Sequence, residues 1–140
     1  MGQKKILLAI DGSPHSNMVL ENSIEYAKLL NAGIILVHCH GKFPVNLGEP
    51  YRESQIAGII RESEKLIAPF MHRLESENIA VEDRLMEEPA GKMICEVAKI
   101  EKCDLIVMGS RGLSNLTNLI VGSVTTRVLQ TAPCPVLVVR

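Results

Sequence analysis

Short, uninterrupted apolar runs alternate with longer segments of helical periodicity along this chain. The runs Lys5–Ile10, Ile34–His38, Leu105–Met108 and Val136–Val139 lack polar alternation. Such runs are typical of strands that are covered on both faces, as in a parallel sheet. This alternation constrains the fold more than any other feature, because strands that alternate with helices form a parallel sheet between two layers of helices.

The segment after the first run predicts a helix that Ser13-Pro14 opens and Asn31–Gly33 ends, since Ser and Pro favour helix starts and Asn and Gly favour helix ends. Apolar residues three or four apart predict a second, long helix from about Ile56 to Leu74. Pro69 lies inside it, so we expect a kink or a loss of stability there.

The second half of the chain repeats the pattern. Ala80–Met86 is polar at several positions, which predicts a strand near a sheet edge. Helices are expected from Pro89 to about Lys102 and from Gly122 to about Gln130. The order β-α-β-α-β-α-β-α-β predicts one α/β domain, residues 1–140: a five-stranded parallel sheet with helices on both faces and right-handed crossovers. Ligands of such sheets bind outside the carboxyl ends of the strands, where the strand order reverses.

Composition excludes several classes of function. The formal net charge of −1 and the pI of about 6.4 argue against a nucleic-acid partner and against an anionic membrane surface. No apolar run approaches the length of a spanning helix, and the apolar start is too short for a secretion signal, so we expect a cytoplasmic protein. The four cysteines form no C-x-x-C pair and no zinc spacing, so we expect them to be small buried apolar residues.

The segment after the fourth strand contains the residues best suited to binding a ligand. Gly109 and Gly112 permit a tight turn and close approach to another molecule, and Gly122-Ser123 marks a helix start, where unpaired amides attract anions. Hydroxyls of Ser123 and Thr125 add donors, so a phosphate chain is the natural occupant. Glycines in this position also occur in ordinary strand-to-helix connections, and the segment matches neither the P-loop nor G-x-G-x-x-G.

The spacing G-x2-G-x9-G-S, which falls on Gly109, Gly112, Gly122 and Ser123, resembles the ATP-binding motif of the universal stress protein family. The resemblance extends over nearly the whole chain: to Ile6–Ser13, Leu36–His38, Asp104–Gly109 and Pro135–Val139. It implies a sheet order of 3-2-1-4-5, with strands one and four adjacent at the point where the order reverses.

The resemblance also implies a site for ATP, with Mg²⁺ held mainly by phosphate oxygens and water. Asp11 would face the ribose or, through the metal, the phosphates; as an alternative, Asp11 is only a turn or cap residue. Backbone near Cys39 would meet the adenine edge, and Arg111 either reaches a phosphate or covers the loop. The full set of nucleotide-binding residues is Ala9, Ile10, Asp11, Cys39, Met108, Gly109, Arg111, Gly112, Gly122, Ser123, Val124 and Thr125. The family further implies a homodimer through Pro135–Val139, a segment too apolar for a free edge.

Other polar clusters do not predict a metal or catalytic site. His38 and His40 point to one face of their strand and Cys39 to the other, so the three cannot bind one ion. His15 is predicted to be a solvated surface residue, and Glu87-Glu88 to be loop charge.

Three functions remain. The first is an ATP-binding regulatory module of the stress response, without a catalytic residue. The second is a slow ATP hydrolase or phosphotransferase that uses Asp11. The third is a nucleotide-free interaction protein, against which the intact glycine spacing argues.

Overall fold

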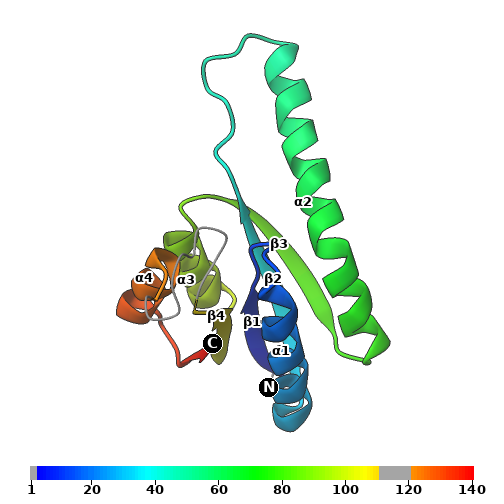
Figure 1. The fold of residues 1–140 in the computed structure, drawn as a ribbon, viewed down its shortest axis with the longest axis vertical. Coiled ribbons are helices and arrows are strands. Elements are labelled where there is room, and N and C mark those ends of the chain that lie inside the picture. Colours follow the sequence, from blue (N-terminus) through cyan, green and yellow to red (C-terminus); the bar gives the residue numbers. More distant parts are fainter. Residues whose placement is uncertain (1–2, 111–120) are drawn as a thin grey trace.

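The computed structural model describes residues 3–110 and 121–140, which form five strands and four helices in strict alternation (Figure 1). The elements are β1 (Lys4–Ala9), α1 (Ser16–Leu30), β2 (Ala32–His40), α2 (Tyr51–Ser76), β3 (Val81–Glu87), α3 (Ala90–Ile100), β4 (Leu105–Gly109), α4 (Ser123–Thr131) and β5 (Val136–Val139). The predicted element order is confirmed.

All strand pairs are parallel, and the sheet order is β3-β2-β1-β4-β5, as the resemblance implied. The central strand β1 pairs with β2 on one side, Ile6 opposite Ile34, and with β4 on the other, Ile6 opposite Leu105. The strand order therefore reverses between β2 and β4, directly beside the carboxyl end of β1. β3 lies at one edge, which explains its polar pattern.

Two apolar layers sandwich the sheet. Ile6 and Leu8 of β1 face α1 and α2, whereas Leu7 faces the side of α3 and α4. Successive residues of β1 thus point to opposite faces, and all three are fully buried. This is why β1 reads as a continuous apolar run. Of the cysteines, Cys103 is buried and the other three are half-buried; all four are free thiols.

The first helix begins later than predicted. Ser13-Pro14 does not open α1, which starts at Ser16, because residues 13–16 form a turn in which the Ser16 N–H donates to the Ser13 carbonyl (3.0 Å). At the other end, Asn31 adopts a left-handed conformation (φ 51°) and caps the helix. Gly33 is therefore not needed as a cap and lies inside β2.

The long helix α2 continues through Pro69 as a single helix. The ring of Pro69 is exposed, so the backbone carbonyl that loses its hydrogen bond faces water. Ser63, Ile67 and Leu74 are its buried residues, and all lie in its second half.

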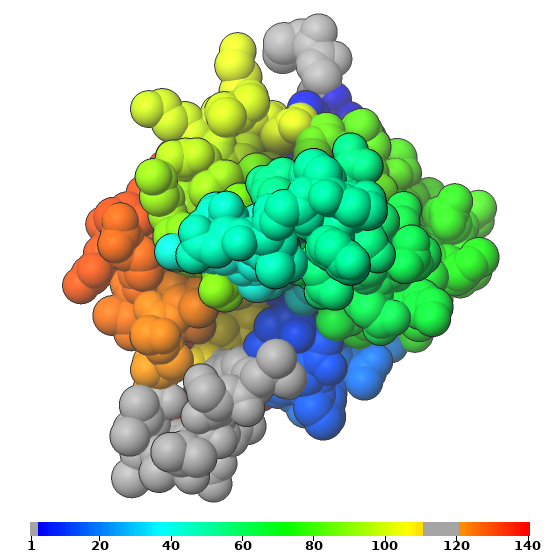
Figure 2. Space-filling view, turned by 90° about the horizontal axis from the view of Figure 1, so that it is seen from above, coloured from blue at the N-terminus to red at the C-terminus, as the bar shows by residue number. Residues whose placement is uncertain are grey.

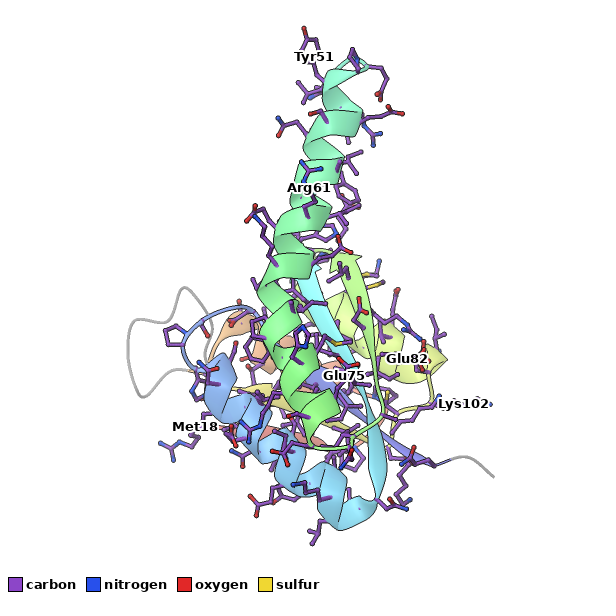
Figure 3. All side chains as sticks on the ribbon, turned by 90° about the vertical axis from the view of Figure 1, so that its right-hand side faces the viewer. Met18, Tyr51, Arg61, Glu75, Glu82 and Lys102 are labelled. Atoms are coloured by element: carbon purple, nitrogen blue, oxygen red, sulfur yellow. The ribbon has the colours of Figure 1, made fainter. Side chains whose placement is uncertain are left out.

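The first half of α2 projects beyond the sheet with the loop before it (Figures 1 and 3). Viewed from above, this projecting part stands in front of the rest of the molecule (Figure 2). Tyr51 at its tip and Ile60 are exposed. We call residues 41–62 the arm.

No helix within the described ranges is long and apolar enough to cross a membrane.

Candidate functional site

A pocket of about 350 Å³ opens at the carboxyl ends of β1, β2 and β4, where the strand order reverses. Besides the strand ends, the first residues of α1, α3 and α4 contribute to its walls. Ten of the twelve predicted site residues line it: Ala9, Ile10, Asp11, Cys39, Met108, Gly109, Gly122, Ser123, Val124 and Thr125. The other two, Arg111 and Gly112, lie outside the described residues.

Asp11 organises the turn that follows β1. Its Oδ1 atom accepts a hydrogen bond from the Ser13 backbone N–H (2.9 Å) and one from the Ser16 hydroxyl (3.1 Å). Gly12, between them, has φ +85°, which glycine adopts without strain. Asp11 is thus the turn residue that the sequence offered as an alternative, and its side chain also lines the pocket. Its contact with a ribose or with phosphates stays a prediction.

The start of α4 forms the opposite wall. The Gly122 N–H donates to the Ser110 carbonyl, and the Thr125 hydroxyl donates to the Gly109 carbonyl (2.8 and 2.7 Å). These bonds fix the first turn of α4 against the end of β4. Among the described residues no side chain caps this helix, so the amides of its first turn remain open to a ligand. The Thr125 hydroxyl, by contrast, already donates its hydrogen bond to the Gly109 carbonyl.

The hydroxyl of Ser13 has no hydrogen-bond partner among the described residues, although Ser13 is only 7% exposed. An unpaired buried hydroxyl is costly, and native proteins rarely leave one unexplained. Because Ser13 lines the pocket, a polar ligand there would give this group its missing partner.

Cys39, at the end of β2, contributes a protonated thiol. Burial first, and then the negative charge of Glu88, raise its pKa to about 11. Since the thiolate is the reactive form, the raised pKa of Cys39 disfavours a nucleophilic role at neutral pH.

We therefore expect iodoacetamide to alkylate Cys39 in the folded protein at least about tenfold more slowly at pH 8 than in urea, because the raised pKa lowers the thiolate fraction more than it raises nucleophilicity. The rate should climb as pH approaches 11. Peptide mass spectrometry follows each cysteine separately. Equal rates for Cys39 in the folded and unfolded chain would contradict this environment.

Besides Ser13 and Ser16 of the Asp11 turn, sequence reasoning missed two titratable residues of the pocket. His15 is half-buried rather than solvated, and its Nε2 donates to the Val139 carbonyl at the end of β5 (2.8 Å). Glu88, which the sequence placed in a loop, lines the pocket between β3 and α3. Both residues follow a strand and precede a helix, so they lie at the carboxyl edge of the sheet. This position could have identified them as candidate site residues.

A second, wider hollow adjoins the pocket. We call it the groove; it lies between the carboxyl end of the sheet and residues 54–66 of α2. Its helix wall carries Arg61 and Lys65, and its floor carries His38 and His40. The two histidines do share one face of β2, as predicted, and no cluster of three or more metal-binding side chains occurs within residues 3–110 and 121–140.

Comparisons with known proteins agree with this architecture. Residues 3–140 match the model of the universal stress protein family. A universal stress protein of Thermus aquaticus is 38% identical over 139 residues, 98% of each chain. The protein YxiE of Bacillus subtilis, also a universal stress protein, is 30% identical over 97% of this chain and 98% of its own.

Solved structures show the same fold. The protein MJ0577 has a TM-score of 0.87 and is 27% identical over 99% of this chain and 96% of its own. More distant structures, 19–20% identical, hold nucleotides: one universal stress protein is in complex with cAMP (TM-score 0.74, 98% and 97% covered), and one from Arabidopsis thaliana has AMP bound (TM-score 0.71, 97% and 90% covered).

Proposed function

This chain belongs to the universal stress protein family, and from that premise we propose that its pocket binds an adenine nucleotide, ATP with Mg²⁺, as a regulatory module of the cytoplasmic stress response. The observation that carries the proposal is the uncapped start of α4 facing the Asp11 turn across one pocket. Relatives that hold AMP and cAMP support nucleotide binding in general.

The phosphates are best accommodated at the start of α4. Open amides of Ser123 and Val124 point to an anion, and the partial positive charge of the helix end favours it. The unpaired Ser13 hydroxyl gives a further donor on the Asp11 side. Within the described ranges no Lys or Arg side chain lines the pocket, so among these residues the backbone amides supply most of the attraction.

The pocket fits Mg²⁺ only as a partner of the phosphates. Asp11 and Glu88 are its two carboxylates among the described residues, and no dedicated cluster of metal ligands is present there. Magnesium keeps several waters and accepts one or two carboxylates together with phosphate oxygens. Bound in this way, the metal would neutralise phosphate charge, and Asp11 is a pocket carboxylate that could help to hold it.

We propose that the protein acts by binding rather than by turnover. Cys39 carries a protonated thiol, and Asp11 is engaged with its own turn. The nucleotide would bridge the Asp11 turn and α4, and a partner protein would recognise that bound state. The β5 edge, whose Val136, Leu137 and Val138 are half-buried, would pair with β5 of a second copy in a homodimer.

The proposal is tested by replacing Asp11. We expect Asp11→Ala to weaken ATP binding at least about tenfold, because it removes a hydrogen-bonding carboxylate and loosens the turn. Isothermal titration calorimetry with ATP and Mg²⁺ measures the affinity. Nucleotide should also protect Cys39, but not Cys95 outside the pocket, from alkylation.

Asp11→Asn is the matched control. An amide oxygen can still accept from Ser13 and Ser16, so the turn should persist while the charge is lost. An intermediate affinity separates the two contributions. Wild-type protein that binds no adenine nucleotide at micromolar concentration contradicts the proposed function.

A further inference from the structure

His15 connects the pocket to the last strand of the sheet. It belongs to the Asp11 turn and lines the pocket, and its Nε2 donates to the Val139 carbonyl at 2.8 Å. A carbonyl oxygen cannot donate a hydrogen bond, so this contact requires the proton on Nε2. Val139 itself does not line the pocket. The bond therefore reaches from one pocket wall to the end of β5, 124 positions away in the sequence.

The same Val139 carbonyl also accepts a bond that leads to the opposite pocket wall. The Ser110 N–H, directly after β4, donates to it at 2.8 Å, so both lone pairs of this oxygen are used. The Ser110 carbonyl in turn accepts from the N–H of Gly122, the residue before α4, at 2.8 Å. Val139 and Ser110 are buried, so water competes little for these bonds. The three bonds form a continuous path from the Asp11 turn to the start of α4.

The pairing of the central strands does not extend as far as the two walls. The β1–β4 register ends at Leu8 and Val107, before the Asp11 turn begins. Within the described ranges, the bond from His15 is the one hydrogen bond that joins this turn to β5 or to α4. The path through Val139 therefore connects the two walls where the sheet no longer does.

Resting on the proposed function, we propose that His15 is a positioning residue of the nucleotide site: through the Val139 carbonyl it aligns the Asp11 turn with the start of α4. A nucleotide that contacts both walls binds more tightly when the walls are aligned in advance, because less motion is lost on binding. The role requires the Nε2 donor of His15 but no contact between its ring and the nucleotide. The end of β5 thereby becomes part of the site although it lies outside the pocket.

His15→Gln and His15→Asn form a matched pair of variants. The carbonyl of residue 15 accepts from the N–H groups of Met18 and Val19, so the backbone holds this position whatever its side chain. The amide nitrogen of Gln reaches about as far as Nε2, whereas that of Asn reaches only as far as Nδ1. By calorimetry with ATP and Mg²⁺, we expect His15→Gln to keep the wild-type affinity within about twofold and His15→Asn to lose at least about tenfold.

Amide hydrogen exchange distinguishes positioning from a general loosening of the fold. In wild type, saturating ATP should slow the exchange of the Ser110 and Gly122 amides, because both lie on the path between the two walls. In His15→Asn, ATP should still slow Gly122 as in wild type, since that amide belongs to the α4 side. The slowing at Ser110, whose N–H donates to Val139, should be at least about fivefold smaller.

Several results would overturn the role of His15 while nucleotide binding stands. One is an Asn variant that binds ATP as tightly as the Gln variant; another is a Gln variant that loses as much affinity as Asn. In His15→Asn, slowing that falls equally at Ser110 and Gly122, or that stays as in wild type at both, likewise contradicts positioning. Failure of the proposed function is a different result, because wild type itself would then bind no adenine nucleotide.

Discussion

Replacing Gly91 with valine is expected to lower the free energy of unfolding by about 2–3 kcal/mol, the range for overpacking a rigid contact, and to weaken nucleotide binding. A Cβ atom at Gly91 would lie 2.8 Å from Cγ and 2.9 Å from Cβ of Arg127. Rotation of the Arg127 side chain can move Cγ, but Cβ is fixed to the backbone of α4, so α3 and α4 must separate. Val124, whose carbonyl would be 3.5 Å away, belongs to the pocket and would move with α4.

Gly58→Val is the control for that variant. Gly58 also lies in a helix, but a Cβ atom added to it would come no closer than 4.0 Å to its nearest neighbour, the end of the Arg61 side chain. Valine is no worse than glycine in a helix, so this variant should keep or slightly gain stability. Urea unfolding followed by circular dichroism suits a chain without Trp. Equal losses in both variants would refute the close α3–α4 contact.

Gly12→Val should be at least as damaging, with a loss of about 3 kcal/mol, because a β-branched residue at positive φ is strained and the new side chain also meets α2. The φ of Gly12 is +85°, and its Cβ would lie 2.6 Å from Cδ1 of Leu66. Leu66 can shift, but the backbone strain remains. Since Gly12 connects Asp11 to Ser13, nucleotide binding should fall together with stability.

For this second variant, Gly41→Val is the comparison. Gly41 is likewise a loop glycine at the carboxyl end of a strand, yet nothing in the described part of the chain lies within 4 Å of its Cβ position and its φ is not positive. Its unfolding curve should superimpose on that of wild type. A Gly12→Val protein as stable as Gly41→Val, with unchanged affinity for ATP, would show that the turn does not require glycine.

The fold class could be predicted from the sequence because the patterns that identify strands and helices extend over many residues. The interior strands β1, β2 and β4 are covered on both faces, so their apolar runs stand out. β3 is equally regular but lies at the edge, and its polar residues located it correctly. The order of the strands came from family resemblance, since periodicity alone does not determine which strands are neighbours.

Element ends were less predictable, because they depend on single side chains. Asp11 accepts from both Ser13 and Ser16, and this delays the start of α1. Asn31 rather than Gly33 supplies the left-handed cap, so β2 gains two residues at its start. Pro69 is tolerated because it faces solvent. These features cannot be predicted before the neighbours of each residue in the folded chain are known.

At the site, reasoning from the sequence found the residues that follow β1 and β4 but not those after β3. Glu88 escaped notice because β3 reads as a polar edge strand and adjacent glutamates look like surface charge. His15 looked like an exposed helix residue, although the turn at residues 13–16 folds it toward the end of β5. The positions of both residues depend on contacts between segments that are far apart in the sequence.

The arm can accept substitutions at positions that do not contribute to the core, unlike most of the rest of the chain. Buried positions of α2 begin only at Ser63, so substitutions at most earlier positions leave the sheet and both apolar layers untouched. Selection can therefore change this projecting surface while the pocket at the carboxyl ends of the strands is preserved. A lineage that duplicates such a gene could diversify what the protein associates with and still inherit the same pocket.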